Sequence, residues 1–253
     1  MVRRPAPVLR PTRRRRPGPV TLALAVPLAS FAYFLAAPAL PALPAGDATV
    51  LVAGTIGLLL VAATALSLLP AHESLVGPLL IVLGSGLLVG ALNIDGERGA
   101  GAGANTFEAM LAGAAGLLLA RWFATAMHAV AVPLFIAAVD VWSVWSGPSS
   151  RLLADGSARV DPLSFDLPAW GERGSAGHLG LSDAVFLSMF GAWAWRYGFR
   201  RPATIGAMVL GLVAALVLSV ALGRPIPALP LIAVGYLLPN LDRIGRLLGH
   251  EPE

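Results

Sequence analysis

Eight apolar stretches, each close to the length of a membrane-spanning helix, follow one another along this chain and constrain its fold more than any other feature. A helix of about 20 apolar residues crosses the hydrocarbon core of a bilayer. Because hydrocarbon offers the backbone no water, such stretches are expected to be helical. The stretches are 20–40, 48–69, 75–94, 106–123, 126–145, 178–197, 203–222 and 228–248. The sequence therefore predicts an all-α polytopic transmembrane helix bundle of about eight spans.

The composition agrees with a membrane protein and excludes several kinds of site. Of the 253 residues, 57% are hydrophobic and 13% are charged, and the mean hydropathy is +0.75. Soluble domains are not this apolar. The chain has no cysteine, so a disulfide, a thiol nucleophile and a zinc-thiolate centre are excluded. All 18 basic residues are arginine, which excludes a lysine Schiff base.

The arginines indicate topology rather than nucleic-acid binding. Seven precede residue 20, including the run Arg13–Arg16, which predicts a cytoplasmic amino terminus. With eight spans, 13 arginines fall inside and 5 fall outside, as the positive-inside rule requires. We therefore expect an integral protein of a prokaryotic cell membrane, with the lipid bilayer and not nucleic acid as its partner. A cleaved signal peptide is the alternative for the first stretch.

The chain divides into four parts by composition. Residues 1–19 form a basic cytoplasmic tail, and 20–125 hold about four spans. Residues 126–248 hold the remaining spans and form the expected catalytic core, with a polar extramembrane loop over 147–177. A short tail, 249–253, ends the chain. Asn105 and Glu108 have the spacing of a capping box, which places the start of the fourth span near them.

Two acidic residues, Asp140 and Asp183, lie inside apolar stretches, where a carboxylate is costly and indicates function. Each lies about five residues from the outer end of its stretch, which predicts a similar depth of roughly 7–8 Å. Pro227 opens the last stretch at the same level. Two carboxyl groups held close together do not both ionise cheaply, so one serves as general acid and the other as general base.

At these residues the chain resembles the presenilin and signal-peptide-peptidase family of intramembrane aspartyl proteases. The matching motifs are Val139-Asp140, Gly180-Leu181-Ser182-Asp183 and Pro227-Ala228-Leu229, in the family's order. The resemblance covers roughly residues 126–248. Val139 stands where the family has tyrosine, and Ser182 where it has a second glycine.

The resemblance implies an endopeptidase that cuts transmembrane segments or signal-peptide remnants. Asp140 and Asp183 would be the catalytic pair. The substrate would be positioned by Gly180, Leu181, Ser182, Pro227, Ala228 and Leu229. The family needs no metal or organic cofactor, and it usually has nine spans, so nine are possible here.

Other readings remain for these residues. The two aspartates can instead serve as a proton relay in a non-catalytic or proton-coupled carrier. His178 is expected to cap the outer end of its helix, and the other histidines lie too far from it to complete a metal site. Asp242 and Arg243 are expected to form a surface ion pair.

Overall fold

The computed structural model describes residues 19–43, 46–93, 101–146, 164–171 and 175–249. About 80% of this part of the chain is helical. The first half contains α1 (Pro19–Ala36), η1 (Ala37–Ala39), α2 (Asp47–Thr49), η2 (Val50–Gly54), α3 (Thr55–Ser67), η3 (Leu69–Ala71), α4 (Val76–Asn93) and α5 (Gly101–Trp122). The second half contains α6 (Ala126–Ser146), β1 (Ser164–Pro168), β2 (Ser175–Gly180), α8 (Leu181–Arg196), α9 (Arg201–Leu222), α10 (Leu229–Leu237), η4 (Leu238–Asn240) and α11 (Leu241–Leu248).

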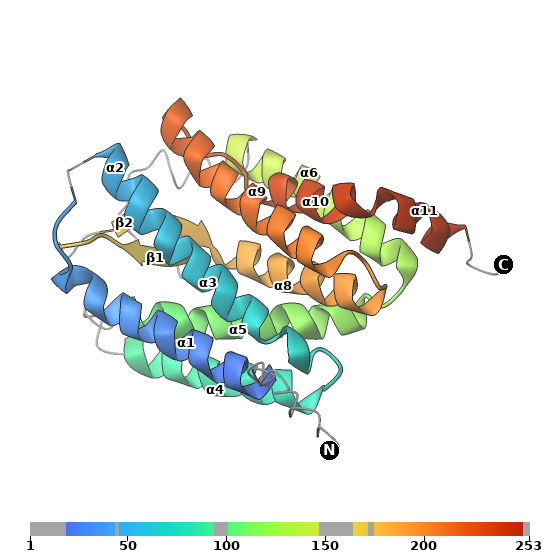
Figure 1. Ribbon diagram of the computed structural model, residues 1–253, viewed down its shortest axis with the longest axis horizontal. Coiled ribbons are helices and arrows are strands. Elements are labelled where there is room, and N and C mark those ends of the chain that lie inside the picture. Colours follow the sequence, from blue (N-terminus) through green and yellow to red (C-terminus); the bar gives the residue numbers. More distant parts are fainter. Residues whose placement is uncertain (1–18, 44–45, 94–100, 147–163, 172–174, 250–253) are drawn as a thin grey trace, which may run out of the picture.

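The helices form a bundle with α3 and α8 at its centre (Figure 1). In the view of Figure 1, α1, α4 and α5 lie below these two helices, and α6, α9 and α10 lie above them. Helix α8 contacts both groups, through α5 on one side and α9 and α10 on the other. Its residues 187–194 are all buried, so α8 is the axis of the core. The predicted all-α bundle is confirmed at this level.

Each of the eight apolar stretches contains helix in the structure, but fewer meet the length and apolarity of a membrane span. Among the described residues, three do: Asp47–Ala71, Ala126–Ser146 and Arg201–Leu222. Two shorter apolar helices, Ala23–Ala39 and Val76–Val89, are below that length. The structure therefore supports association with a membrane through three candidate spanning helices.

Glycines set the closest helix contacts, as is common in membrane bundles. A Cβ on Gly116 of α5 would lie 2.2 Å from the Val185 carbonyl oxygen of α8. In the α9–α10 pair, a Cβ on Gly211 would lie 2.6 Å from the Leu231 carbonyl oxygen, and one on Gly235 would lie 2.5 Å from that of Ala207. Only glycine permits these backbones to approach so closely.

The expected polar loop over 147–177 contains a strand and continues into a second one. Strands β1 and β2 pair antiparallel, with Ser164 opposite Gly180 and Asp166 opposite His178. Phe165, Leu167 and Leu179 are buried in the main core. Residues 147–163 and 172–174 lie outside the described residues. Burial of these apolar side chains explains why this segment pairs rather than staying a simple loop.

Two expected helix boundaries are wrong. Helix α5 begins at Gly101, so Asn105 lies inside it and does not open a capping box with Glu108. The last stretch, 228–248, is not one helix, because a 3₁₀ turn at Leu238–Asn240 separates α10 from α11. Pro239 lies in this turn, and proline cannot donate the backbone hydrogen bond that would continue a helix.

Candidate active site

Asp140 reaches from α6 to the start of α10. Its Oδ2 accepts a hydrogen bond of 3.0 Å from the backbone N–H of Leu229. Leu229 is the first residue of α10, and the preceding residue, Ala228, has no side chain that can cap the helix. The first N–H groups of a helix lack partners within it and attract negative charge. Asp140 therefore supplies from another helix the acceptor that α10 lacks.

Asp183 lies in the first turn of α8, at the third helical position, and is 9% exposed. Its carboxyl group folds back toward the N-cap residue Gly180, whose backbone N–H donates to it. This is the acidic half of a capping box. A Cβ on Gly180 would lie 3.3 Å from Asp183 Oδ2, so glycine leaves room for the carboxyl group to turn back.

The two aspartates lie on α6 and α8, two helices that contact each other. The charge of Asp140 acts on the carboxyl group of Asp183, which places the two groups within electrostatic reach of each other. Since Leu229 contacts Asp140 as well, the structure brings together all three motifs, from positions 140, 183 and 229. The arrangement offers two carboxyl groups, one buried and one half-buried, beside an irregular proline-containing segment at 225–228.

The remaining residues of the motifs take different positions around this pair. Pro227 and Leu229 are buried, and Leu181 and Ala228 are half-buried. Ser182 is exposed, so the side chain that replaces the family's glycine does not fill the space between the helices. Val139 is also exposed, on the outer side of α6.

Polar contacts join the hairpin to α5, and the sequence did not predict them. Asn105 of α5 donates from Nδ2 to the Asp166 carbonyl oxygen at 2.7 Å and accepts from the Asp166 N–H at Oδ1, at 3.3 Å. The His178 and Asp166 side chains approach to 3.7 Å across the strands. His178 is thus a strand residue, two positions before Gly180, and not the expected helix cap. Only the strand pairing, which the polar composition of the segment hides, brings these residues together.

No group of three metal-ligating side chains occurs in the described part of the chain. No protein-family model matches this chain, and no curated protein matches it either.

Proposed function

We propose that this protein is an intramembrane aspartyl endopeptidase that hydrolyses peptide bonds within transmembrane segments or signal-peptide remnants. The observation that carries the proposal is the convergence of three distant motifs: Leu229 donates to Asp140, and Asp183 lies within electrostatic range of Asp140 on a contacting helix. An isolated structural aspartate would account for one of these contacts but not for the convergence of all three.

The two carboxyl groups divide the work of the reaction. Asp140, held at Oδ2 by the Leu229 N–H, keeps Oδ1 to contact a water molecule. One carboxylate takes a proton from that water as the water oxygen bonds to the peptide carbonyl carbon. The other group, protonated, gives its proton to the carbonyl oxygen. The resulting gem-diol then collapses: the group that gave up its proton takes one from a diol hydroxyl as the C–N bond breaks, and the group that took the water proton passes it to the leaving nitrogen.

The surroundings of the pair suit an extended substrate. A transmembrane helix hides its peptide bonds, so the segment to be cut must unwind before water can attack. The segment from Pro225 to Ala228 precedes α10 and is not helical, so its backbone groups are available to an extended peptide. The proposed positioning residues are those of the Gly180–Ser182 and Pro227–Leu229 motifs.

The proposal also includes a membrane topology that is more detailed than the three candidate spanning helices. We infer that all eight helical stretches cross or enter a prokaryotic cell membrane, with the amino terminus in the cytoplasm and the aspartates near the outer side. The exposed Trp142 and Trp145 at the outer end of α6 agree with an aromatic belt at that level. The exposed Trp122 occupies the corresponding position at the other end.

The test is cleavage of a single-span peptide in detergent by the wild type and by Asp140→Asn, Asp183→Asn and Asp47→Asn variants. Asp47 is an exposed acid at the start of α2 and serves as the matched control. Removal of one member of a catalytic pair typically costs several orders of magnitude in rate, as general acid–base roles and water activation are lost together. Cleavage should disappear in the first two variants and persist in Asp47→Asn.

Two outcomes contradict the proposal. Cleavage that survives Asp140→Asn or Asp183→Asn would exclude the pair as the catalyst. An inactive wild type that instead takes protons into proteoliposomes, dependent on both aspartates, would favour the carrier. Because the chain has no cysteine, oxidative crosslinking of an Asp140→Cys/Asp183→Cys double variant tests proximity independently of activity.

A further inference from the structure

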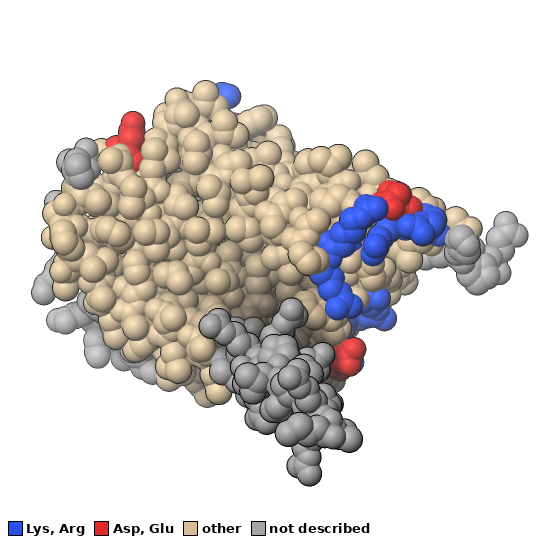
Figure 2. All heavy atoms as spheres, viewed as in Figure 1, with Lys and Arg blue, Asp and Glu red and all other residues tan. Residues whose placement is uncertain are grey.

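One end of the bundle is strongly basic. Five of the seven arginines that the structure describes lie where α8 turns into α9 and where α11 packs beside that turn (Figure 2). They are Arg196, Arg200, Arg201, Arg243 and Arg246. Asp242 is the acidic residue within this group, which leaves a net formal charge of four positive units. We call these five arginines the basic cluster.

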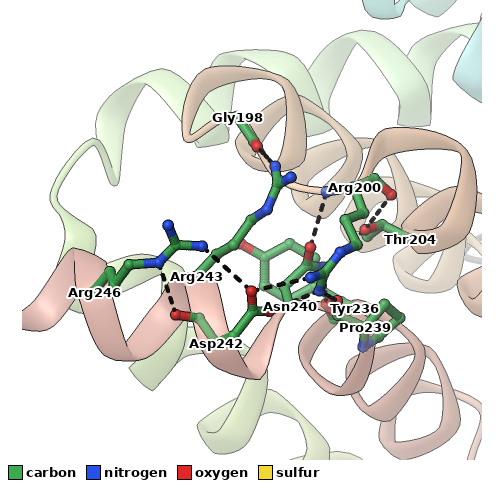
Figure 3. Close-up of polar contacts among 9 residues, drawn as sticks. All are labelled: Gly198, Arg200, Thr204, Tyr236, Pro239, Asn240, Asp242, Arg243 and Arg246. Atoms are coloured by element: carbon green, nitrogen blue, oxygen red, sulfur yellow. Dashed lines mark hydrogen bonds and ion pairs between the residues drawn. The ribbon is translucent and has the colours of Figure 1, made fainter.

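The basic cluster is ordered by contacts that leave most of its charge in place. Arg243 donates to the Gly198 carbonyl oxygen, and Arg246 and Arg200 share the Asp242 carboxylate (Figure 3). Arg201 donates to the Trp195 carbonyl oxygen at 3.3 Å, and its guanidinium lies 4.3 Å from the centre of the Trp195 ring. A carbonyl oxygen or an aromatic ring carries no net charge, so these contacts fix the guanidinium groups without neutralising them.

An exposed apolar stripe runs along α10 and α11 next to the cluster. Val234, Leu238, Leu241 and Leu248 are all exposed, and Leu238 and Leu241 are 64% and 59% exposed. On α11, Leu241 and Leu248 are seven residues apart and share a face, whereas Ile244 is buried. Helix α11 therefore has one face packed on the bundle, one apolar face exposed and one face with Arg243 and Arg246. A helix that lies in a membrane interface has this distribution.

One exposed tryptophan, Trp122, lies near the same end of the bundle. The Trp193 Nε1–H donates to the Ala120 carbonyl oxygen and the Tyr197 hydroxyl to that of Ala124, so the α5–α6 turn lies beside the end of α8. Trp122 projects from that turn and is 84% exposed. Tryptophan prefers the boundary between headgroups and hydrocarbon. The basic cluster and this tryptophan therefore lie at the same end of the bundle.

We propose that α11 and the α8–α9 turn form a docking surface for anionic lipids of the inner leaflet. The basic cluster binds the phosphodiester headgroups, and the stripe Val234, Leu238, Leu241 and Leu248 enters the hydrocarbon. Charge complementarity selects this partner, because four net positive charges next to exposed leucines match a negatively charged lipid surface. The inference rests on the membrane topology proposed above, which puts this end of the bundle on the inner side, and not on the peptidase activity proposed for the other end.

The test is retention of lipid during native mass spectrometry from nanodiscs that contain phosphatidylcholine and phosphatidylglycerol in equal amounts. The wild type should retain phosphatidylglycerol preferentially. Each arginine near an anionic surface contributes roughly fivefold to lipid affinity, so an Arg196→Gln/Arg243→Gln variant should show that preference weakened by at least about tenfold. Arg196→Lys/Arg243→Lys preserves charge and should retain most of it. Arg224→Gln, which removes a charge from the opposite end, should match the wild type.

Equal retention of the two lipids by the wild type would overturn the proposal, and so would a Gln variant that retains phosphatidylglycerol as the wild type does. If the Gln variant does not fold, a second measurement tests the proposal. A nitroxide on Leu241→Cys should lie below the phosphate level in electron paramagnetic resonance depth measurements, and one on Asp242→Cys should lie above it. Equal depths would contradict docking of the apolar stripe.

Discussion

The backbone N–H of Leu229 donates a hydrogen bond to Oδ2 of Asp140, 89 positions earlier in the chain. This bond joins the start of α10 to the C-terminal half of α6. It gives Asp140 a structural role as the acceptor for a helix start, in addition to the chemistry proposed for it. The two roles make different demands on the side chain, since capping needs an oxygen and catalysis needs an ionisable group.

Asp140→Asn and Asp140→Leu separate these roles. The Asn side chain keeps an oxygen that accepts from Leu229, whereas Leu leaves that N–H without its partner, at a cost of about 1–3 kcal/mol. Both variants should be inactive, and thermal unfolding in detergent should show Asp140→Leu clearly below Asp140→Asn. Equal melting temperatures would show that the bond contributes little to stability.

Gly211→Ala and Gly206→Ala form a matched pair on α9. A Cβ at 211 would lie 2.6 Å from the Leu231 carbonyl oxygen, whereas one at 206 meets nothing within 4 Å. The first substitution should destabilise the protein by about 1–3 kcal/mol because it forces α9 and α10 apart. The second should be neutral or stabilising by up to about 1 kcal/mol, since alanine has a higher helix propensity than glycine. Unfolding in detergent that ranks the two variants the other way would contradict the close packing.

Asn105→Ala should loosen the hairpin without disturbing α8. Asn105 is buried and makes both hydrogen bonds to the backbone of Asp166, so its removal leaves an N–H and a carbonyl group without these partners. Hydrogen exchange at 164–168 should accelerate, by up to about tenfold for each 1.4 kcal/mol of lost local stability. Thr106→Val is the control, because the buried Thr106 hydroxyl has no hydrogen-bond partner within the described part of the chain. Faster exchange in Thr106→Val as well would point to general loosening of α5.

Ionisation of Asp242 should make the stability of the protein depend on pH in the acid range. Hydrogen bonds from Arg200 above all, and the charges of Arg200 and Arg246, hold the pKa of the Asp242 carboxyl below its usual range. A lowered folded pKa means that the stabilisation is complete above the ordinary carboxyl pKa, near 4, and is lost as the pH falls through the folded pKa. Melting temperatures of the wild type and Asp242→Asn should therefore differ most above about pH 4 and converge below it. A difference that stays constant with pH would show that these contacts do not depend on ionisation.

Much of the fold was predictable because long apolar stretches leave the backbone few alternatives to helix. The ends of helices were harder to place. Helix α5 begins at Gly101, although glycine is a poor helix former. The polar Asn105 therefore indicated a helix start four residues too late. Pro239 did carry a signal for the break in the last helix, since an internal proline ends a regular helix.

Pairing between distant residues was the least predictable feature. The sequence placed Asp242 beside Arg243, but the structure pairs Asp242 with Arg200, 42 positions away, and with Arg246. Arg243 contacts Gly198 instead. Adjacent residues on a helix point in different directions, so neighbours in sequence are poor candidates for an ion pair. Equal depth in antiparallel helices did indicate that positions 140, 183 and 229 share one level, but only the structure shows the Asp140–Leu229 bond.

The helices that carry the site are attached to the bundle with unequal strength. Glycine contacts join α5 to α8 and α9 to α10, whereas α6 contains no glycine and only 11% of its apolar span is buried. Helix α6 packs chiefly against α10 and contacts α8 much less, so the weakest contact at the site lies between the helices that carry Asp140 and Asp183. Separation of α6 from α8 would therefore pull the two carboxyl groups apart, while Asp140 stays hydrogen-bonded to Leu229.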